Sequence, residues 1–276
     1  MPWFPDFAGA AELVRRQTWA AGEVDPVGQY LAALSSGDPR DLESVWPGEV
    51  VVHDPRAGEV RGHQQLRRFV RRNQAWMAER NIRVETVAAT VAAPRAVVEL
   101  LAHLAGDEPV VGWPVAVVAE SVDDRSVVFR TYCSQRPLTG RHELRPPILP
   151  PGGPPPSDVV GRYQATLDAG NVEAIVATFA PDGYFREPYG PHSTHRGTDQ
   201  LRSFFARRFS AGGGIGLEHC MVTDDGVRCV LEYNCLRWGS HQLPPQAGLG
   251  VYERGPDGLL AAVRVYDDVA APAGTG

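Results

Sequence analysis

The chain of 276 residues contains no lysine, because all 27 of its basic residues are arginine. An amine side chain is needed for Schiff-base catalysis, for anchoring pyridoxal phosphate and for Walker-type phosphate-binding loops. The sequence therefore excludes these three classes of function.

Cysteine is scarce, and the four residues form no C-x-x-C pair, which indicates reduced thiols as in a cytoplasmic protein. They are Cys133, Cys220, Cys229 and Cys235. His192 and His195 lie close in sequence but have no third ligand at a spacing typical of metal sites. We expect neither a bound metal nor another cofactor.

The chain also lacks an excess of positive charge and long apolar segments. With 33 acidic residues against 27 arginines its net charge is -6, which argues against a general nucleic-acid-binding protein. No apolar run approaches the roughly 18 residues of a membrane span. Asp6 and Glu12 interrupt the first apolar residues, and no basic segment precedes them, so we expect no secretory signal. The expected location is the cytoplasm, without membrane contact.

A length of 276 residues is typical of about two domains, and a proline-rich stretch separates them. Residues 137–157 hold eight prolines and predict an extended linker without a helix or a central strand. The predicted domains are residues 25–136 and 158–270. Residues 1–24 form an N-terminal extension, with one helix expected from Ala8 to Ala21.

The two halves repeat each other, as a duplicated domain would. VGQYLAALSSG at residues 27–37 matches VGRYQATLDAG at residues 160–170, an offset of 133. Near this offset further pairs align: Trp46 with Phe179, Asp54 with Glu187, Glu99 with Glu232, Glu120 with Glu253, and Arg130 with Arg264.

Each half begins with helical patterns and ends with short β-branched runs. Apolar residues at three- and four-residue intervals predict helices at the start and again over residues 64–77. The later runs predict antiparallel strands. We expect an α+β fold in which a curved antiparallel sheet wraps about three helices. The two halves are expected to pack as a pseudo-dimer within one chain, and association of two chains stays open.

The second repeat reads VVGRYQATLDAG, AIVATFAPDGYFREPYG and RGTDQLRSFF over residues 159–205. This segment resembles the start of bacterial ketosteroid isomerases, members of the NTF2-like and SnoaL-like superfamily, and the first repeat resembles them less closely. The resemblance implies two NTF2-like (cystatin-like α+β cone) domains. In these enzymes, a tyrosine on the first helix precedes the catalytic acid on the first strand by 24 residues. Tyr163 and Glu187 have this spacing, and so do Tyr30 and Asp54.

The resemblance implies that the tyrosines donate hydrogen bonds to an oxyanion and that Glu187 or Asp54 moves a proton. A C=C shift or an aldol ring closure needs such a base and such a donor. The family's second donor, an aspartic acid, aligns with Gly250 and in the first repeat with Val117, which offer no donor. The predicted pocket residues are Phe185, Phe205, Glu232, Glu99, Gly250, Trp46 and Phe179. Alternatively, Glu99 and Glu232 form structural ion pairs with Arg130 and Arg264.

Three functions remain open. The first is a cofactor-independent acid–base enzyme acting on a small hydrophobic carbonyl compound, with the second domain favoured because Val70 and Val50 replace Phe205 and Gly183 in the first. The second is a non-catalytic ligand-binding or scaffold protein, for which a collapsed cavity is expected. The third is an epoxide hydrolase like the tandem polyether type, which needs two carboxyl groups in one cavity, either Glu187 with Glu232 or Asp54 with Glu99.

Overall fold

The computed structural model describes residues 26–104, 111–153 and 156–270, and they divide into two compact units, up to Cys133 and from Ser134 onward. The predicted helix from Ala8 to Ala21 lies outside the described residues.

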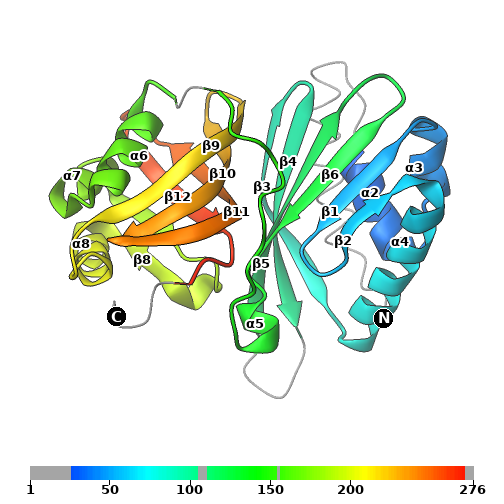
Figure 1. Cartoon of the computed structure of the whole chain (residues 1–276), viewed down its shortest axis with the longest axis horizontal. Helices are drawn as coiled ribbons and strands as arrows, with labels where there is room; N and C mark the ends of the chain where they lie inside the picture. The colour runs from blue at the N-terminus through cyan, green and yellow to red at the C-terminus, as the bar shows by residue number, and fades with distance from the viewer. Residues whose placement is uncertain (1–25, 105–110, 154–155, 271–276) are drawn as a thin grey trace. The chain divides into compact units, whose positions relative to one another are not determined.

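The described residues of the first unit form three helices and six strands, and the helices lie on one face of the sheet (Figure 1). The sheet order is β2-β1-β6-β5-β4-β3. The elements are α2 (Pro26–Ser36), α3 (Arg40–Val45), β1 (Val50–Asp54), β2 (Gly58–Arg61), α4 (Gly62–Glu79), β3 (Arg83–Ala92), β4 (Arg95–Leu104), β5 (Val111–Ser121) and β6 (Val127–Tyr132).

The second unit repeats this arrangement, with the sheet order β8-β7-β12-β11-β10-β9, and its helices α6, α7 and α8 lie on one face (Figure 1). The elements are α5 (Arg136–Thr139), α6 (Val159–Ala169), α7 (Val172–Val176), β7 (Phe179–Arg186), the 3-10 turn η1 (Pro191–Ser193), β8 (Thr194–Arg196), α8 (Gly197–Arg208), β9 (Gly214–Asp224), β10 (Arg228–Gly239), β11 (His241–Arg254) and β12 (Leu260–Tyr266).

The α+β fold with two repeated units is confirmed, with one correction to the sheets. The last strand of each unit runs parallel to the first, β6 beside β1 and β12 beside β7, so both sheets are mixed rather than antiparallel. Alternating apolar residues predict strands, but they do not reveal which distant strands pair or in which direction.

The proline-rich linker differs from its prediction at its start, where residues form a short helix. The short helix α5 contains Pro137, which is tolerated because the first helical turn needs no N–H donor from it. Farther along, the carbonyl of Arg145 accepts a hydrogen bond from Ala247 N–H (2.9 Å), and Gly152 N–H donates to the carbonyl of His219 (2.9 Å). The linker is therefore bonded to strands of the second unit.

Helix α6 carries Tyr163, and its ends fix its position. Asp158 caps the start by accepting a hydrogen bond from Val160 N–H (3.0 Å), and Gly170 ends it with φ +67°. A Cβ atom on Gly214 would lie 1.9 Å from the carbonyl oxygen of Leu167, so this glycine allows β9 to approach the helix closely. Gly214, the first residue of β9, thereby allows the helix to pack closely against the sheet.

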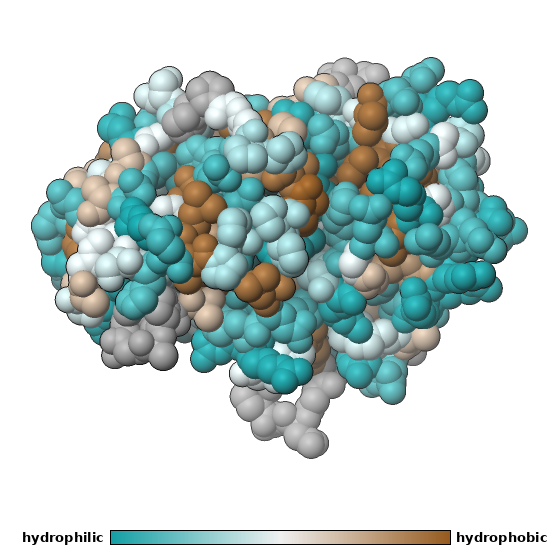
Figure 2. Space-filling model, viewed as in Figure 1, coloured by the Kyte–Doolittle hydropathy of each residue, from teal (hydrophilic) through white to brown (hydrophobic). Residues whose placement is uncertain are grey.

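Polar side chains cover most of the surface drawn in Figure 2, and apolar residues appear there as separate patches. Within the described ranges, no helix is both long enough and apolar enough to cross a membrane.

Candidate active site

Each unit contains a cavity between its helices and its sheet. Each cavity holds about 670 Å³ of space free of atoms, part of which is solvent at its mouth. Tyr163 and Glu187 both line the cavity of the second unit, and Tyr30 and Asp54 both line that of the first. The structure therefore brings each predicted pair to one space, while the catalytic roles of these residues stay predictions.

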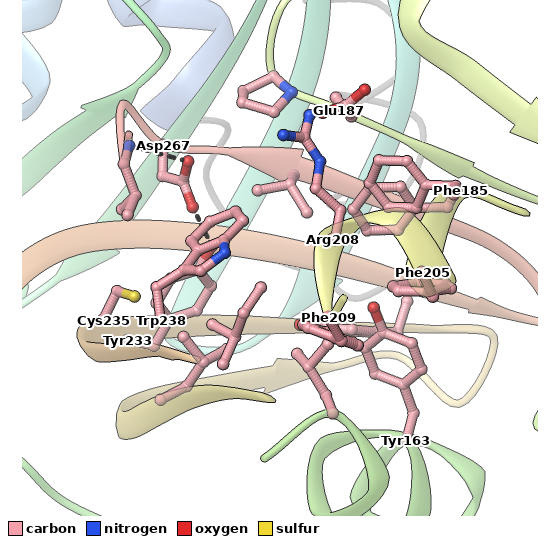
Figure 3. A pocket seen from close by; sticks show the side chains of 18 of the residues that line it. Tyr163, Phe185, Glu187, Phe205, Arg208, Phe209, Tyr233, Cys235, Trp238 and Asp267 are labelled. Atoms are coloured by element: carbon pink, nitrogen blue, oxygen red, sulfur yellow. Dashed lines mark hydrogen bonds and ion pairs between the residues drawn. The ribbon is translucent and has the colours of Figure 1, made fainter. Parts of the chain in front are cut away.

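Aromatic and aliphatic side chains form most of the second cavity, with polar groups at separate positions on its wall (Figure 3). Tyr163 reaches it from α6, and Asp267 reaches it from the end of β12 on another side. The other lining residues are Leu167, Phe185, Glu187, Pro188, Tyr189, Phe204, Phe205, Arg208, Phe209, Ile215, Leu217, Tyr233, Cys235, Trp238, Tyr252, Val265 and Val269.

Asp267 is a carboxyl group of the second cavity that the sequence analysis did not single out. The Tyr233 hydroxyl donates to its Oδ2 atom (2.7 Å), and Val269 N–H lies 3.3 Å from its Oδ1 atom. Burial raises the pKa of Asp267 to about 6, although both hydrogen bonds oppose this shift. A carboxyl group with a pKa of about 6 can exchange a proton near neutral pH.

Glu187, the predicted base, is engaged by two cationic or polar partners. Arg208 Nη2 bonds to its Oε2 atom (2.5 Å), and His195 Nε2 lies 3.0 Å from its Oε1 atom. The His195 ring also stacks on Phe204, with ring centroids 4.1 Å apart. Arg208 and His195 thus hold both carboxylate oxygens of Glu187, and these bonds would have to open before the carboxylate could contact a ligand.

Two glycines on β11 make room for tyrosines in this cavity. A Cβ atom on Gly250 would lie 2.5 Å from the Tyr252 hydroxyl oxygen, and a Cβ atom on Gly248 would lie 2.5 Å from Tyr233 Cε2. Gly250 is the position that aligns with the family's second oxyanion donor. The Tyr252 hydroxyl lies against this position, where burial raises its pKa and a hydrogen bond with the Gln164 side chain lowers it.

We expect Gly250→Ala to destabilise the second domain by about 1–3 kcal/mol, because the new methyl group overlaps the buried Tyr252 ring. Urea unfolding measures this change. In the double variant with Tyr252→Ala the methyl group has space, so the two single effects should not add. Additive effects would contradict the steric explanation.

The phenols of the two repeats differ in their hydrogen bonds. Burial and the nearby Asp54 carboxylate raise the pKa of Tyr30, while a hydrogen bond with the Thr131 side chain lowers it. Burial and the neighbouring Tyr252 raise the pKa of Tyr163, and its hydroxyl has no hydrogen-bond partner among the described residues. Tyr163 therefore stays protonated and can donate to a ligand, whereas Tyr30 is already bonded.

The first cavity lacks the polar groups that distinguish the second. At the positions equivalent to Tyr233, Gly248, Gly250 and Asp267, its wall carries Leu100, Val115, Val117 and Cys133. The remaining lining residues are Tyr30, Leu31, Leu34, Asp54, Pro55, Arg56, Phe69, Asn73, Trp76, Met77, Ile82, Val84, Ala102, Trp113 and Thr131. The Asp54 Oδ1 atom accepts hydrogen bonds from the backbone N–H groups of Arg56 (2.9 Å) and Ala57 (2.8 Å).

Five of the predicted pocket residues do not line either cavity: Glu232, Glu99, Gly250, Trp46 and Phe179. Phe185 and Phe205 do line the second cavity. Phe179 packs behind Tyr163 with ring centroids 5.7 Å apart, and the Trp46 indole donates to Gln29 Oε1 (2.9 Å). The pattern of apolar residues locates the core, but it does not separate the cavity wall from the layer behind it.

Buried arginines of the last strands pair with the repeated glutamates of the strands beside them. Arg130 Nη1 lies 2.7 Å from Glu120 Oε2, and Arg264 Nη2 lies 3.0 Å from Glu253 Oε2. The proposed pairing of these arginines with Glu99 and Glu232 stays a prediction. Both glutamates are buried.

Cys235 lines the second cavity but is a poor nucleophile, because burial raises its pKa to about 12 and keeps it a thiol at neutral pH. Within the described part of the chain, no three His, Cys, Asp or Glu side chains gather as a metal site would require.

A family model described as the SnoaL-like domain matches residues 27–141 and 160–263. The chain belongs to the SnoaL-like domain family. Each match covers one repeat, and together they include most of the chain. A comparison with curated proteins gave no match.

Several solved structures resemble one SnoaL-like repeat. The epoxide hydrolase/cyclase-like enzyme SalBIII, whose structure concerns pyran ring formation in the polyether salinomycin, is 19% identical, with 39% of this chain and 86% of that chain covered and a TM-score of 0.33. A SnoaL-like protein from Burkholderia thailandensis is 15% identical, with 38% and 87% covered and a TM-score of 0.32. An NTF2-like protein from Cytophaga hutchinsonii is 17% identical, with 39% and 85% covered and a TM-score of 0.31.

Proposed function

We propose that the second domain is a cofactor-independent acid–base enzyme that isomerises or cyclises a small hydrophobic carbonyl compound. One observation carries the proposal: the cavity combines the unbonded hydroxyl of Tyr163 with the Asp267 carboxyl, whose pKa is about 6. Apolar side chains surround both groups, and an apolar surrounding strengthens the electrostatic effect of each.

In the proposed reaction the Asp267 carboxylate takes a proton from the carbon next to the substrate carbonyl. The electron pair of the broken C–H bond forms an enolate, and the negative charge on its oxygen accepts a hydrogen bond from Tyr163, with Tyr252 nearby. Return of the proton from Asp267 to another carbon gives the isomer. Alternatively, the enolate carbon attacks a second carbonyl group of the same molecule and closes a ring, and the proton on Asp267 then passes to the alkoxide oxygen that this attack forms.

Epoxide opening is the second candidate, and the carboxyl groups of the cavity favour it. Glu187 and Asp267 line the same space, as this chemistry requires, although the predicted partner of Glu187 was Glu232. Below pH 6 the neutral Asp267 could donate its proton to an epoxide oxygen. Since Glu187 is bonded to Arg208 and His195, its use as the second acid–base group would require these bonds to open.

The experiment follows deuterium exchange at the carbon next to the carbonyl of 2-tetralone in D₂O by NMR. We expect the native protein to accelerate exchange and Tyr163→Phe to lose about 10- to 100-fold, since it lacks the donor to the oxyanion. Tyr30→Phe is the matched control in the other repeat and should retain the native rate. Binding of 2-tetralone without exchange would favour the ligand carrier and contradict the proposal, as would equal losses in both variants.

A further inference from the structure

Trp238 lines the second cavity, and its indole carries an unpaired hydrogen-bond donor that is covered in this conformation. Its indole Nε1 is buried and has no hydrogen-bond partner among the described residues. A buried N–H group without a partner is costly, and such groups in native structures call for an explanation. A ligand oxygen in the cavity would supply the missing acceptor.

A β-bulge turns Trp238 toward the cavity. Along β10, Tyr233 and Cys235 both line the cavity, as alternate residues of a strand should. Continued alternation would place Arg237 on this wall. Instead, the register shifts between Cys235 and Arg237 against both neighbouring strands, and Trp238 follows on the cavity side. Bulges often re-aim a side chain next to a functional site.

Arg237 holds the bulge in place from the other side of the strand. Its Nη1 atom donates to the carbonyls of Gly239 (2.8 Å) and Gly214 (3.1 Å), and its Nη2 atom bonds to Asp168 Oδ1 (2.5 Å). In the first unit, β4 pairs with β5 without a register shift over residues 95–104. The bulge is thus a feature of the repeat that carries Asp267.

Trp238 and Tyr163 are separated across the cavity. Tyr163 rises from α6, whereas Trp238 packs against the cluster formed by Tyr233, Cys235 and Val269 (Figure 3). A single carbonyl oxygen cannot accept hydrogen bonds from both Tyr163 and Trp238, because these donors lie on different walls. Each donor therefore needs a separate acceptor. Side chains at binding sites commonly change rotamer when a ligand enters, which would bring the covered Nε1 atom to an acceptor.

We infer that Trp238 Nε1–H binds a second oxygen of the ligand, opposite the oxygen bound by Tyr163. The ligand of this domain is then an apolar, ring-sized compound with two oxygen functions at its two ends, such as a diketone or a hydroxyketone. This inference rests on the proposed function only for the position of the reacting carbonyl group.

The test compares the affinities of 2-naphthol and 2,6-dihydroxynaphthalene by titration calorimetry. Both probes carry one hydroxyl group for the Tyr163 side, and only the diol has a second oxygen at the far end. We expect the native protein to bind the diol about 3- to 10-fold more tightly, the effect of one neutral hydrogen bond. Trp238→Phe keeps an aromatic ring without the N–H group, so it should lose this preference while still binding 2-naphthol.

Trp76→Phe, which changes the first cavity, is the matched control and should keep the preference for the diol. A second measurement does not depend on the variant: the indole N–H resonance missing in Trp238→Phe should shift downfield with the diol and not with 2-naphthol. Equal affinities for both probes in the native protein, or an unchanged preference in Trp238→Phe, would overturn the inference. These measurements record binding and not catalysis. Their interpretation therefore does not depend on whether another variant loses proton exchange.

Discussion

Asp267→Asn is expected to reduce catalysed proton exchange on 2-tetralone by about 10²- to 10⁴-fold at pH 8, the range typical of a lost general base. Asparagine has nearly the same shape, and its oxygen can still accept the hydrogen bond from the Tyr233 hydroxyl. The cavity should keep its form while the group that takes the proton is gone. Binding of 2-tetralone should change far less than the rate.

The pH profile of proton exchange with the native protein gives an independent measure of the same group. Burial raises the pKa of Asp267 to about 6, and the carboxylate is the form that accepts a proton. The rate constant kcat/KM should therefore rise about tenfold per pH unit below pH 6 and level off above it. In Asp267→Asn the residual rate should lack this step.

Glu187→Gln serves as the comparison for this experiment. It removes the charge that pairs with Arg208, so a moderate decrease is expected from disorder at the cavity wall. A loss in Glu187→Gln as large as that predicted for Asp267→Asn, together with near-native activity of Asp267→Asn, would assign the base to Glu187. That outcome would restore the role inferred from sequence spacing.

The shared cavity of Tyr163 and Glu187 could be predicted because their spacing matches that of the ketosteroid isomerases, and because both residues lie early in the repeat. A helix and the strand that follows it soon afterwards commonly pack together, so a spacing of 24 residues carries spatial information. The same reasoning brought Tyr30 and Asp54 together. The spacing could not predict the bonds of Glu187, since Arg208 and His195 come from later elements.

Asp267 was missed because it follows the last strand, 80 residues after Glu187. Signals for it were nevertheless present in the comparison of the repeats. The first repeat has Cys133 at the equivalent position, and Gly248 and Gly250 replace Val115 and Val117 on one face of a strand. The second repeat thus has smaller side chains on this strand and an additional acid nearby, a combination that is typical of a site holding larger polar groups.

No comparable indication of Trp238 was present in the sequence. A bulge reverses which residues of a strand face the cavity, and the amino-acid composition of the strand does not reveal it. The parallel pairing of β12 with β7 was hidden for a similar reason. Both features depend on hydrogen bonds between strands that are distant in sequence. Local periodicity indicates that a strand exists and leaves its neighbours undetermined.

Asp267→Asn should also make the second domain more stable at neutral pH. The folded state raises the pKa of Asp267 from 3.8 to about 6. A group with a raised pKa favours the folded state fully below its unfolded pKa, and this contribution is lost as the pH rises through the folded value. Two pKa units correspond to about 3 kcal/mol, so the contribution of Asp267 to stability should fall by about this much between pH 4 and pH 7.

Asparagine carries no charge at any of these pH values, so Asp267→Asn should not show this loss. We expect the variant to be more stable than the native protein by about 3 kcal/mol at pH 8 and similar to it at pH 4. Urea unfolding at both pH values measures the difference, and hydrogen–deuterium exchange of peptides from β10 to β12 assigns it to this domain. Asp182→Asn, at an exposed site of the same domain, is the matched control and should leave stability unchanged at both pH values. A destabilised Asp267→Asn at pH 8 would mean that hydrogen bonds stabilise the ionised carboxylate in the folded state. The raised pKa, on which the assignment of Asp267 as the base rests, would then be absent.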